Sequence, residues 1–162
     1  MTDYTSYQSP FSWRYGSAEM RRIWSEHHKR LLWRQIWVAL AEVQVGYGLV
    51  RPEQAADLRA HSAEIDLPRA LEIEAEIQHD LMAEVRVFAE QAALGGGIIH
   101  FGATSMDVED SADALRLRQG LDLGLQSLPQ LRRRLAALRR QYPRPLLTAF
   151  THRQPAEPST LG

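Results

Sequence analysis

A long repeat of apolar residues between positions 114 and 142 constrains the fold of this 162-residue chain more than any other feature. Successive members are 3, 4, 4, 3, 3, 4, 3 and 4 residues apart, an average of about 3.5, which is typical of helices that pack lengthwise in bundles. We therefore expect one helix over about 109–141, roughly 50 Å long, that Pro129 kinks or divides with Ser127 as a cap. Such a helix needs apolar partners along its length. The repeat consists of Ala114, Leu117, Leu121, Leu125, Leu128, Leu131, Leu135, Leu138 and Tyr142.

Helical patterns also fill most of the sequence before this repeat. One runs from about 18 to 48 behind Ser17, a suitable N-cap. Pro52 and Pro68 begin two further helices, and the second reaches about residue 93 and bends near His79 before the glycine run 95–97 ends it. The apolar stripe of the first pattern consists of Leu32, Ile36, Ala39, Val43 and Tyr47.

No segment shows the alternation that is typical of β-strands, although residues 146–150 suit a short extended piece. The predicted fold class is therefore all-α. We expect an N-terminal helical domain over residues 1–108, followed by the beginning of a central helical-bundle domain over residues 109–162.

Composition excludes several kinds of site and partner. The chain has no cysteine, which removes disulfides and thiolate metal sites and is compatible with a reducing cytosol. A formal net charge of −1 gives no signature of nucleic-acid binding. No stretch approaches the roughly 20 apolar residues that a membrane helix needs, and the first residues do not form a signal peptide. We expect a cytoplasmic protein with neither a nucleic-acid nor a membrane partner.

The segment from His100 to Asp107 is a candidate ligand-binding loop. Gly102 lets a ligand approach the backbone, and Thr104 and Ser105 supply hydroxyl groups just before a helix. The simpler interpretation is helix capping by Thr104 or Ser105. The negative charges of the acidic residues that follow would then interact favourably with the positive end of the helix dipole. Capping explains those acidic residues, but it does not explain the histidine and the glycine.

A second histidine lies in the segment 151–162. His152 can donate or accept a proton near neutral pH, and the two prolines after it indicate a turn that leads into a new helix. The start of that helix, marked by Ser159, Thr160 and Gly162, offers backbone N–H groups that hold an anion. Taken alone, His152 is more simply a turn residue.

Two residue pairs complete the candidate site. The aspartate of His79-Asp80 either orients the histidine ring or stays at the surface, and Arg14-Tyr15 pairs a phosphate-binding cation with a ring that can stack. His27-His28 has no partner at metal-ligand spacing, so we expect no metal site.

Four segments, in this order, resemble those of the adenylosuccinate lyases in the fumarase/aspartase superfamily. They are RYGSAEM from Arg14, HDLMA from His79, the run from His100 to Asp110 and the run 151–162. The resemblance covers essentially the whole chain. The loop reads GATSMD here, whereas argininosuccinate lyases carry a Ser-Arg-Asn-Asp type of loop and fumarases a Ser-Ser-Asn-Asp type.

The resemblance implies a purine-biosynthesis enzyme that performs a β-elimination without a metal or an organic cofactor. Adenylosuccinate gives AMP and fumarate, and SAICAR gives AICAR and fumarate. A base removes a proton from the succinyl carbon, and an acid protonates the departing nitrogen. By position, His152 matches the general acid of the family, and His79 and Asp80 match residues that contact the substrate and support that acid. Thr104 and Ser105 match groups that hold the succinyl end of the substrate, and His100 matches a further active-site histidine. Arg14 and Tyr15 match contacts to the nucleotide phosphate.

Two departures from the family pattern matter. Gln78 stands beside the substrate-contacting pair where many members have arginine. Members are also more than twice as long, and the loop with the catalytic serine base and the long central helices that build the homotetramer are absent from this sequence. We therefore expect the chain as given to be an N-terminal portion that is inactive by itself.

Two alternatives stay open. The leucine repeat also suits a non-catalytic helical interaction or oligomerisation module that keeps the motif residues for packing or ligand binding. The other alternative is a different lyase of the superfamily, which the Thr104-Ser105 loop disfavours.

Overall fold

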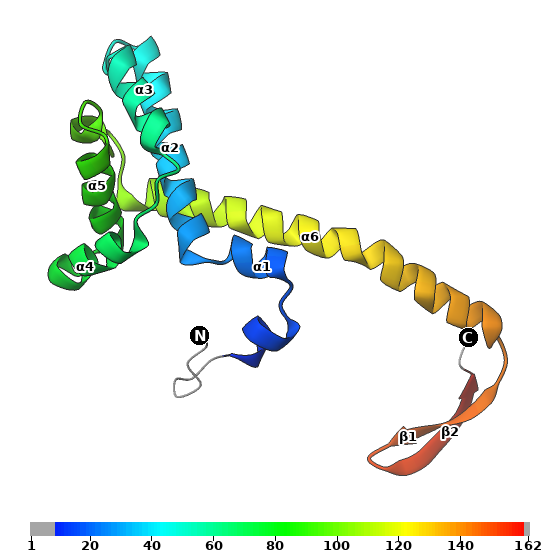
Figure 1. The fold of residues 1–162 in the computed structure, drawn as a ribbon. Coiled ribbons are helices and arrows are strands. Elements are labelled where there is room, and N and C mark those ends of the chain that lie inside the picture. Colours follow the sequence, from blue (N-terminus) through cyan, green and yellow to red (C-terminus); the bar gives the residue numbers. More distant parts are fainter. Residues whose placement is uncertain (1–8, 161–162) are drawn as a thin grey trace. The chain divides into compact units, whose positions relative to one another are not determined.

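The structure, a computed structural model, describes residues 9–160. The chain divides after Gly120 into two compact units. Helices dominate, and the described part of the chain has only two strands, so the all-α prediction is confirmed apart from one hairpin (Figure 1). The expected domain boundary between residues 108 and 109 stays a prediction. In chain order the elements are η1 (Phe11–Tyr15), α1 (Ala18–Ile23), α2 (Glu26–Gly46), α3 (Pro52–His61), α4 (Leu67–Ile77), α5 (Asp80–Gln91), η2 (Gly96–Ile98), α6 (Ser105–Gln141), β1 (Leu146–Thr151) and β2 (Gln154–Thr160).

Two of the expected helices are each interrupted once. Ser17 caps α1 as predicted, because its side chain accepts the N–H of Met20 at 3.1 Å. Ser25 caps α2 in the same way through the N–H of His28 at 3.2 Å, so the pattern from 18 to 48 is two helices. The predicted bend near His79 is a complete break, with α4 ending before it and α5 beginning after it.

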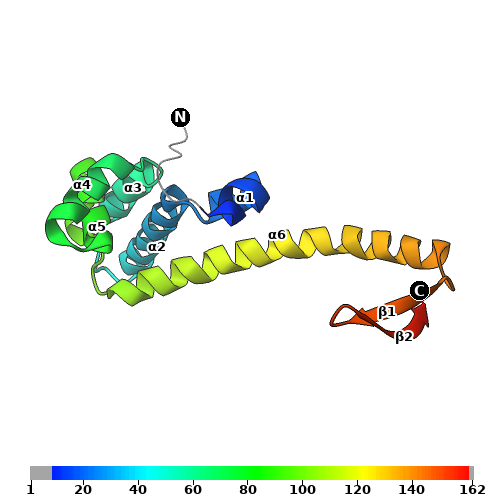
Figure 2. The ribbon, with the colours of Figure 1, turned by 90° about the horizontal axis from the view of Figure 1, so that it is seen from below.

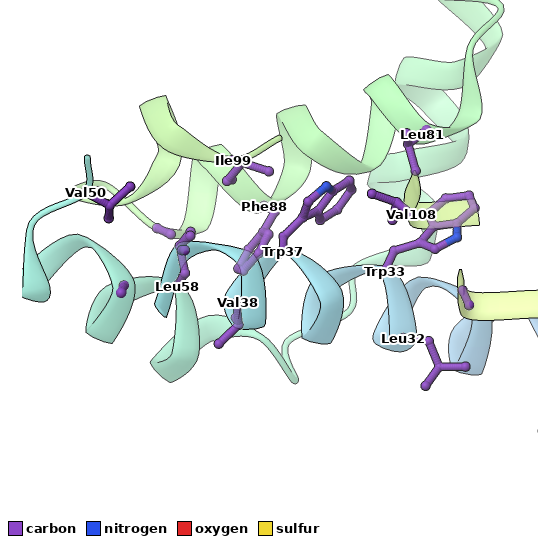
Figure 3. Packing of buried hydrophobic residues seen from close by; sticks show 14 residues of the cluster. Leu32, Trp33, Trp37, Val38, Val50, Leu58, Leu81, Phe88, Ile99 and Val108 are labelled. Atoms are coloured by element: carbon purple, nitrogen blue, oxygen red, sulfur yellow. The ribbon is translucent and has the colours of Figure 1, made fainter. Parts of the chain in front are cut away.

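The core of the first unit forms around one face of α2. Trp33, Trp37 and Ala41 are each 2% exposed or less (Figure 3). The prediction that Val43 and Tyr47 belong to the core-facing stripe of this helix is wrong, because Val43 is 60% exposed and Tyr47 is 78% exposed. The helix instead buries the two tryptophans, which carry more apolar surface than the stripe residues. The remaining members of this cluster are Leu32, Val38, Val50, Ala55, Leu58, Leu81, Phe88, Ala92, Ile99, Val108 and Ala112.

A buried ion cluster joins α2 to α4 and α5. Glu84 is fully buried and accepts hydrogen bonds from Arg34 Nε at 2.6 Å and from Arg30 Nη1 at 3.2 Å. Arg34 also donates to two backbone carbonyls in the segment 61–64, and Arg30 Nη2 lies 2.9 Å from the carboxylate of Glu74. Because these charges are held out of water, each depends on its partners. The cluster therefore sets α4 and α5 against α2.

Asp57 of α3 holds the turn that follows α5. Its carboxylate accepts the N–H groups of Leu94 at 2.8 Å and Gly95 at 2.9 Å. The hydrogen bond from Gly95 is the main reason why the pKa of Asp57 lies below its usual value. Gly95 is pressed against α3, since a Cβ there would lie 2.6 Å from the Gln54 carbonyl oxygen and 2.7 Å from Leu58 Cγ.

Gly95→Ala is expected to lower the free energy of unfolding by about 1–3 kcal/mol, because the added methyl group meets a backbone carbonyl that has little room to move. Gly97→Ala is the matched control, since a Cβ at Gly97 meets nothing within 4 Å. Urea unfolding followed by circular dichroism measures both variants. Equal stabilities for the two would contradict the close packing of Gly95.

Helix α6 is 37 residues long and continues through Pro129, so the predicted division there is wrong, whereas the alternative, a kink at Pro129, stays a prediction. Ser127 does not cap a new helix, because its hydroxyl donates to the carbonyl of Gly124 at 2.7 Å. The start of α6 packs into the core through Val108 and Ala112, beside α2 (Figure 2). The leucines of the repeat, from Leu117 to Leu138, are 49–66% exposed. The apolar partners that the repeat predicts are therefore not supplied by the described residues.

The second unit ends in an antiparallel hairpin of β1 and β2, with His152 and Arg153 in the turn. Both turn residues have positive φ, 51° and 66°, which is the two-residue turn that reverses a twisted strand pair. The predicted turn is confirmed, but the predicted helix start is wrong, because Ser159 and Thr160 pair with β1. Gly162, the last residue of that predicted helix start, lies outside the described residues.

No helix in the described range is long and apolar enough to span a membrane.

Candidate active site

His79 and Asp80 lie at the break between α4 and α5. Gln78 ends α4 in the left-handed conformation, with φ of 56°, and its side chain donates to the Ala75 carbonyl at 2.8 Å. His79 then caps α5, because its Nδ1 accepts the N–H of Met82 at 3.4 Å. This leaves Nε2, on a side chain that is 46% exposed, as the ring nitrogen available to a ligand.

A charged groove beside Asp80 brings three helices together. Lys29 of α2 lies 2.8 Å from the carboxylate of Glu26 and 3.9 Å from that of Asp80. The Lys29 ammonium also lies 5.0 Å from the centre of the Trp33 ring. The groove therefore presents charges of both signs next to the predicted substrate-contacting pair. Its lining consists of Glu26, Lys29, Trp33, Asp80, Glu109, Asp113 and Arg116.

Glu109 of α6 is the carboxylate in this groove whose protonation the surroundings change most clearly. Partial burial raises the pKa of Glu109, and the nearby charge of Asp80 raises it further. His79 and Lys29 act in the opposite direction. Ser105 lies four residues before Glu109 and therefore on the same face of α6. The groove thus brings Asp80 together with the first turns of α6, which Ser105 begins.

Glu109→Gln is expected to stabilise the chain relative to wild type at pH 7 and to leave its stability unchanged well below pH 4. A raised folded-state pKa means that wild type loses stability as the pH rises from the unfolded-state pKa of about 4.3 through the folded value. Glutamine resembles the protonated form and removes that loss. Urea midpoints at the two pH values measure the difference, with the exposed Glu76→Gln as the control. A gain that is equal at both pH values would contradict the assignment.

His100 lies in a loop that α2 holds at two points. His100 and Gly102 both have positive φ, 67° and 74°. Trp37 Nε1 donates to His100 Nδ1 at 3.2 Å, with the two rings edge to face, and Gln44 Nε2 donates to the Phe101 carbonyl at 2.8 Å. Two buried side chains of α2, Trp37 and Gln44, therefore hold the loop in place.

Ser105 begins α6 directly after Thr104, and capping by the hydroxyl group of either residue stays a prediction. Asp107 reaches back to accept the N–H of Thr104 at 2.9 Å, so it satisfies one of the free donors at the helix start. Thr104 is exposed and Ser105 is half-buried. The hydroxyl groups of Thr104 and Ser105 thus lie at the start of α6.

Arg14 and Tyr15 lie in η1, a five-residue turn of π-helix. The Arg14 guanidinium stacks on the Trp13 ring at 4.6 Å, and Tyr15 lies 6.2 Å from the Phe11 ring. Phe11, Trp13 and Tyr15 are each more than half exposed, and Arg14 is exposed as well. Within the described range, neither Arg14 nor Tyr15 forms an ion pair or a hydrogen bond with His79.

The predicted site residues are thus divided between the two units. His79, Asp80, Ser105 and their neighbours belong to the first unit, whereas His152 lies in the hairpin turn of the second. Sequence analysis missed Lys29 and Trp37 as parts of the site, and it treated Glu109 only as a helix-start acid. The one signal for Glu109 was its spacing of four from Ser105.

No family model matches the chain. Adenylosuccinate lyase from Saccharomyces cerevisiae is 37% identical over 166 residues, and the enzyme of the same name from Schizosaccharomyces pombe is 38% identical over 167 residues. Both alignments cover 100% of this chain and 34% of the relative. The chain is related to adenylosuccinate lyase.

That relationship extends to archaea, since the adenylosuccinate lyase of Pyrococcus horikoshii is 38% identical over 156 residues, which are 94% of this chain. The chain spans about a third of the length of these adenylosuccinate lyases. The resemblance that the four segments predicted is therefore confirmed over the whole sequence.

Two solved structures have the same fold. A fumarate lyase from Mesorhizobium sp. BNC1 matches with a TM-score of 0.78 and 27% identity, over 91% of this chain and 35% of its own. A 3-carboxy-cis,cis-muconate lactonizing enzyme from Pseudomonas putida matches with a TM-score of 0.81 and 27% identity, over 93% and 36% of the two chains. The fold is thus shared by enzymes with different named activities, whereas the three sequence relatives described above are adenylosuccinate lyases.

Proposed function

We propose that this chain supplies part of the active site of an adenylosuccinate lyase, a C–N lyase of purine biosynthesis. The enzyme eliminates fumarate from adenylosuccinate to leave AMP, and from SAICAR to leave AICAR. The observation that carries the proposal is identity of 37–38% to adenylosuccinate lyases along the entire chain. The order of the four motif segments supports it.

The proposed elimination needs an acid and a base on opposite sides of the substrate. The base takes the proton from the succinyl carbon, the carbon electrons form the double bond of fumarate, and the C–N bond breaks. His152 then protonates the departing nitrogen, so that the purine leaves as a neutral amine. We assign the base to a serine outside this chain, and no metal or organic cofactor takes part.

The remaining residues hold an anionic substrate. Arg14 and Tyr15 bind the nucleotide phosphate, and Thr104 and Ser105 hold the succinyl carboxylates with the helix start behind them. His79 and Asp80 contact the substrate and support the acid. Gln78 has no charge to add at the position where arginine is common.

The proposal places the chain within a larger protein that forms a homotetramer, with sites completed between subunits. It follows that the purified chain is inactive alone. Mixing it with adenylosuccinate and following the purine absorbance tests this, and the expected result is no turnover. Robust turnover would show that the chain already contains a base.

A chimera tests the activity itself. In it, the chain replaces the segment that it matches in the Saccharomyces cerevisiae relative, with which it aligns over 166 residues. The expected result is release of AMP and fumarate from adenylosuccinate. A folded tetrameric chimera without lyase activity would contradict the proposal.

A second candidate function is a helical interaction module without catalysis. The observation that favours it is the leucine face of α6, which is 49–66% exposed between Leu117 and Leu138. Calorimetric titration with AMP and fumarate, together with sedimentation of the chain, distinguishes the two functions. Self-association with no ligand binding favours the module, and ligand binding favours the lyase.

A further inference from the structure

The hydrogen bond between Trp37 and His100 determines which nitrogen of the histidine carries a proton. Trp37 is 1% exposed, and its indole N–H is a donor only. The acceptor at 3.2 Å is His100 Nδ1. An acceptor nitrogen carries no proton, so the neutral ring must carry its proton on Nε2.

The alternative tautomer is disfavoured by burial. A proton on Nδ1 would face the indole N–H, and the buried Trp37 donor would lose its partner. The edge-to-face contact of the two rings, 87° between planes, limits rotation of the imidazole away from the indole. Positive φ at His100 and the hydrogen bond from Gln44 to the next carbonyl fix the backbone beneath it.

Trp37 and Gln44 are seven residues apart and therefore lie on one face of α2, two turns from each other. One rigid helix thus holds both the ring and the backbone of the loop. Within residues 9–160, no acceptor forms a hydrogen bond with His100 Nε2, and His100 is half-buried rather than enclosed. The Nε2–H group is therefore left for a ligand.

We propose that Trp37 is a positioning residue that fixes His100 as the Nε2–H tautomer, so that His100 presents a hydrogen-bond donor to an anionic or carbonyl oxygen of the ligand. The ligand's identity rests on the proposed lyase function, whereas the tautomer does not. In this arrangement His100 does not act as a general base through Nδ1, because that lone pair is used by Trp37.

Nitrogen NMR of the ¹⁵N-labelled 162-residue chain at about pH 8, where an ordinary histidine is neutral, tests the tautomer directly. The expected His100 spectrum has an unprotonated Nδ1 and a protonated Nε2 with widely separated shifts, a preference of about tenfold or more. His100→Asn identifies the resonances by removing them. Averaged shifts for the two nitrogens, or a protonated Nδ1, would overturn the proposal.

Variants of the two tryptophans separate positioning from packing. Trp37→Phe keeps an aromatic ring but removes the donor, so the two His100 nitrogen shifts are expected to move toward each other. Trp33→Phe is the matched control, since Trp33 is also buried on α2, and it is expected to leave the His100 shifts unchanged. Unchanged shifts in a folded Trp37→Phe chain would overturn the role of Trp37.

A second measurement covers the case in which Trp37→Phe does not fold. In His100→Leu the Trp37 indole N–H loses its acceptor, and its proton resonance is expected to shift upfield, while the amide of His100→Asn can still accept. An indole resonance unchanged in His100→Leu overturns the proposal. All these measurements are made without substrate, so their failure leaves the proposed lyase function standing, and an inactive chimera leaves the tautomer standing.

Discussion

Glu84→Gln is expected to lower the free energy of unfolding by about 3–5 kcal/mol, because it leaves two buried arginines without their shared countercharge. Arg30 and Arg34 are 1% and 0% exposed, so water does not replace the lost carboxylate. Glutamine fills the same space but accepts through one oxygen only. Since small domains are stable by only about 5–15 kcal/mol, much of the unit's stability depends on this one charge.

The measurement for Glu84→Gln is urea unfolding followed by circular dichroism. Glu42→Gln is the matched control on the same helix bundle, because Glu42 pairs with Arg59 at the surface, where their side chains are 39% and 64% exposed. An exposed pair of this kind contributes about 0–1 kcal/mol. Comparable losses for the two variants would contradict a special role for the buried cluster.

His152→Ala in the active chimera is expected to lower kcat by about 10²–10⁴-fold, the usual contribution of a positioned general acid. His152→Asn is the better variant structurally, because asparagine tolerates the positive φ of 51° at this turn. Both variants remove the ionisable ring. We expect both to lose turnover while the thermal unfolding midpoint of the Asn variant stays close to that of the parent.

The purine absorbance assay measures both His152 variants. The exposed His27→Ala is the control, since it removes a histidine from the surface of α2 and is expected to leave kcat unchanged. A near-normal rate in His152→Asn would show that another group protonates the departing nitrogen. The acid would then have to be sought outside the hairpin turn.

Helix starts were predictable because they depend on local chemistry. Ser17 lies where a hydroxyl can satisfy free N–H groups, and His79 interrupts a pattern that is otherwise helical. The rotation of α2 was not predictable from apolar spacing alone. That spacing extended the expected stripe to Val43 and Tyr47, whereas the helix buries Arg30 and Arg34 with Glu84.

The hairpin was missed because it buries little. Its strands are exposed along nearly their whole length and therefore lack the alternation that identifies a strand with one buried face. Proline at two β2 positions also argued against a strand, although a two-stranded ribbon has only edges, where proline is tolerated.

The motifs predict His79, Asp80 and Ser105 as residues of the site, and their roles stay predictions. Lys29 and Glu109 join them only because α2 and the start of α6 pack against α5, and that crossing depends on core side chains far away in sequence. The same holds for Trp37, whose contact with His100 spans 63 positions.

The decisive measurement is a crystal structure of the active chimera with adenylosuccinate bound. We expect one cavity around the ligand, lined by His79, His100 and His152 from one or more subunits, with the His152 ring beside the nitrogen that departs. Three histidines at separate places, with no cavity shared even between subunits, would contradict it.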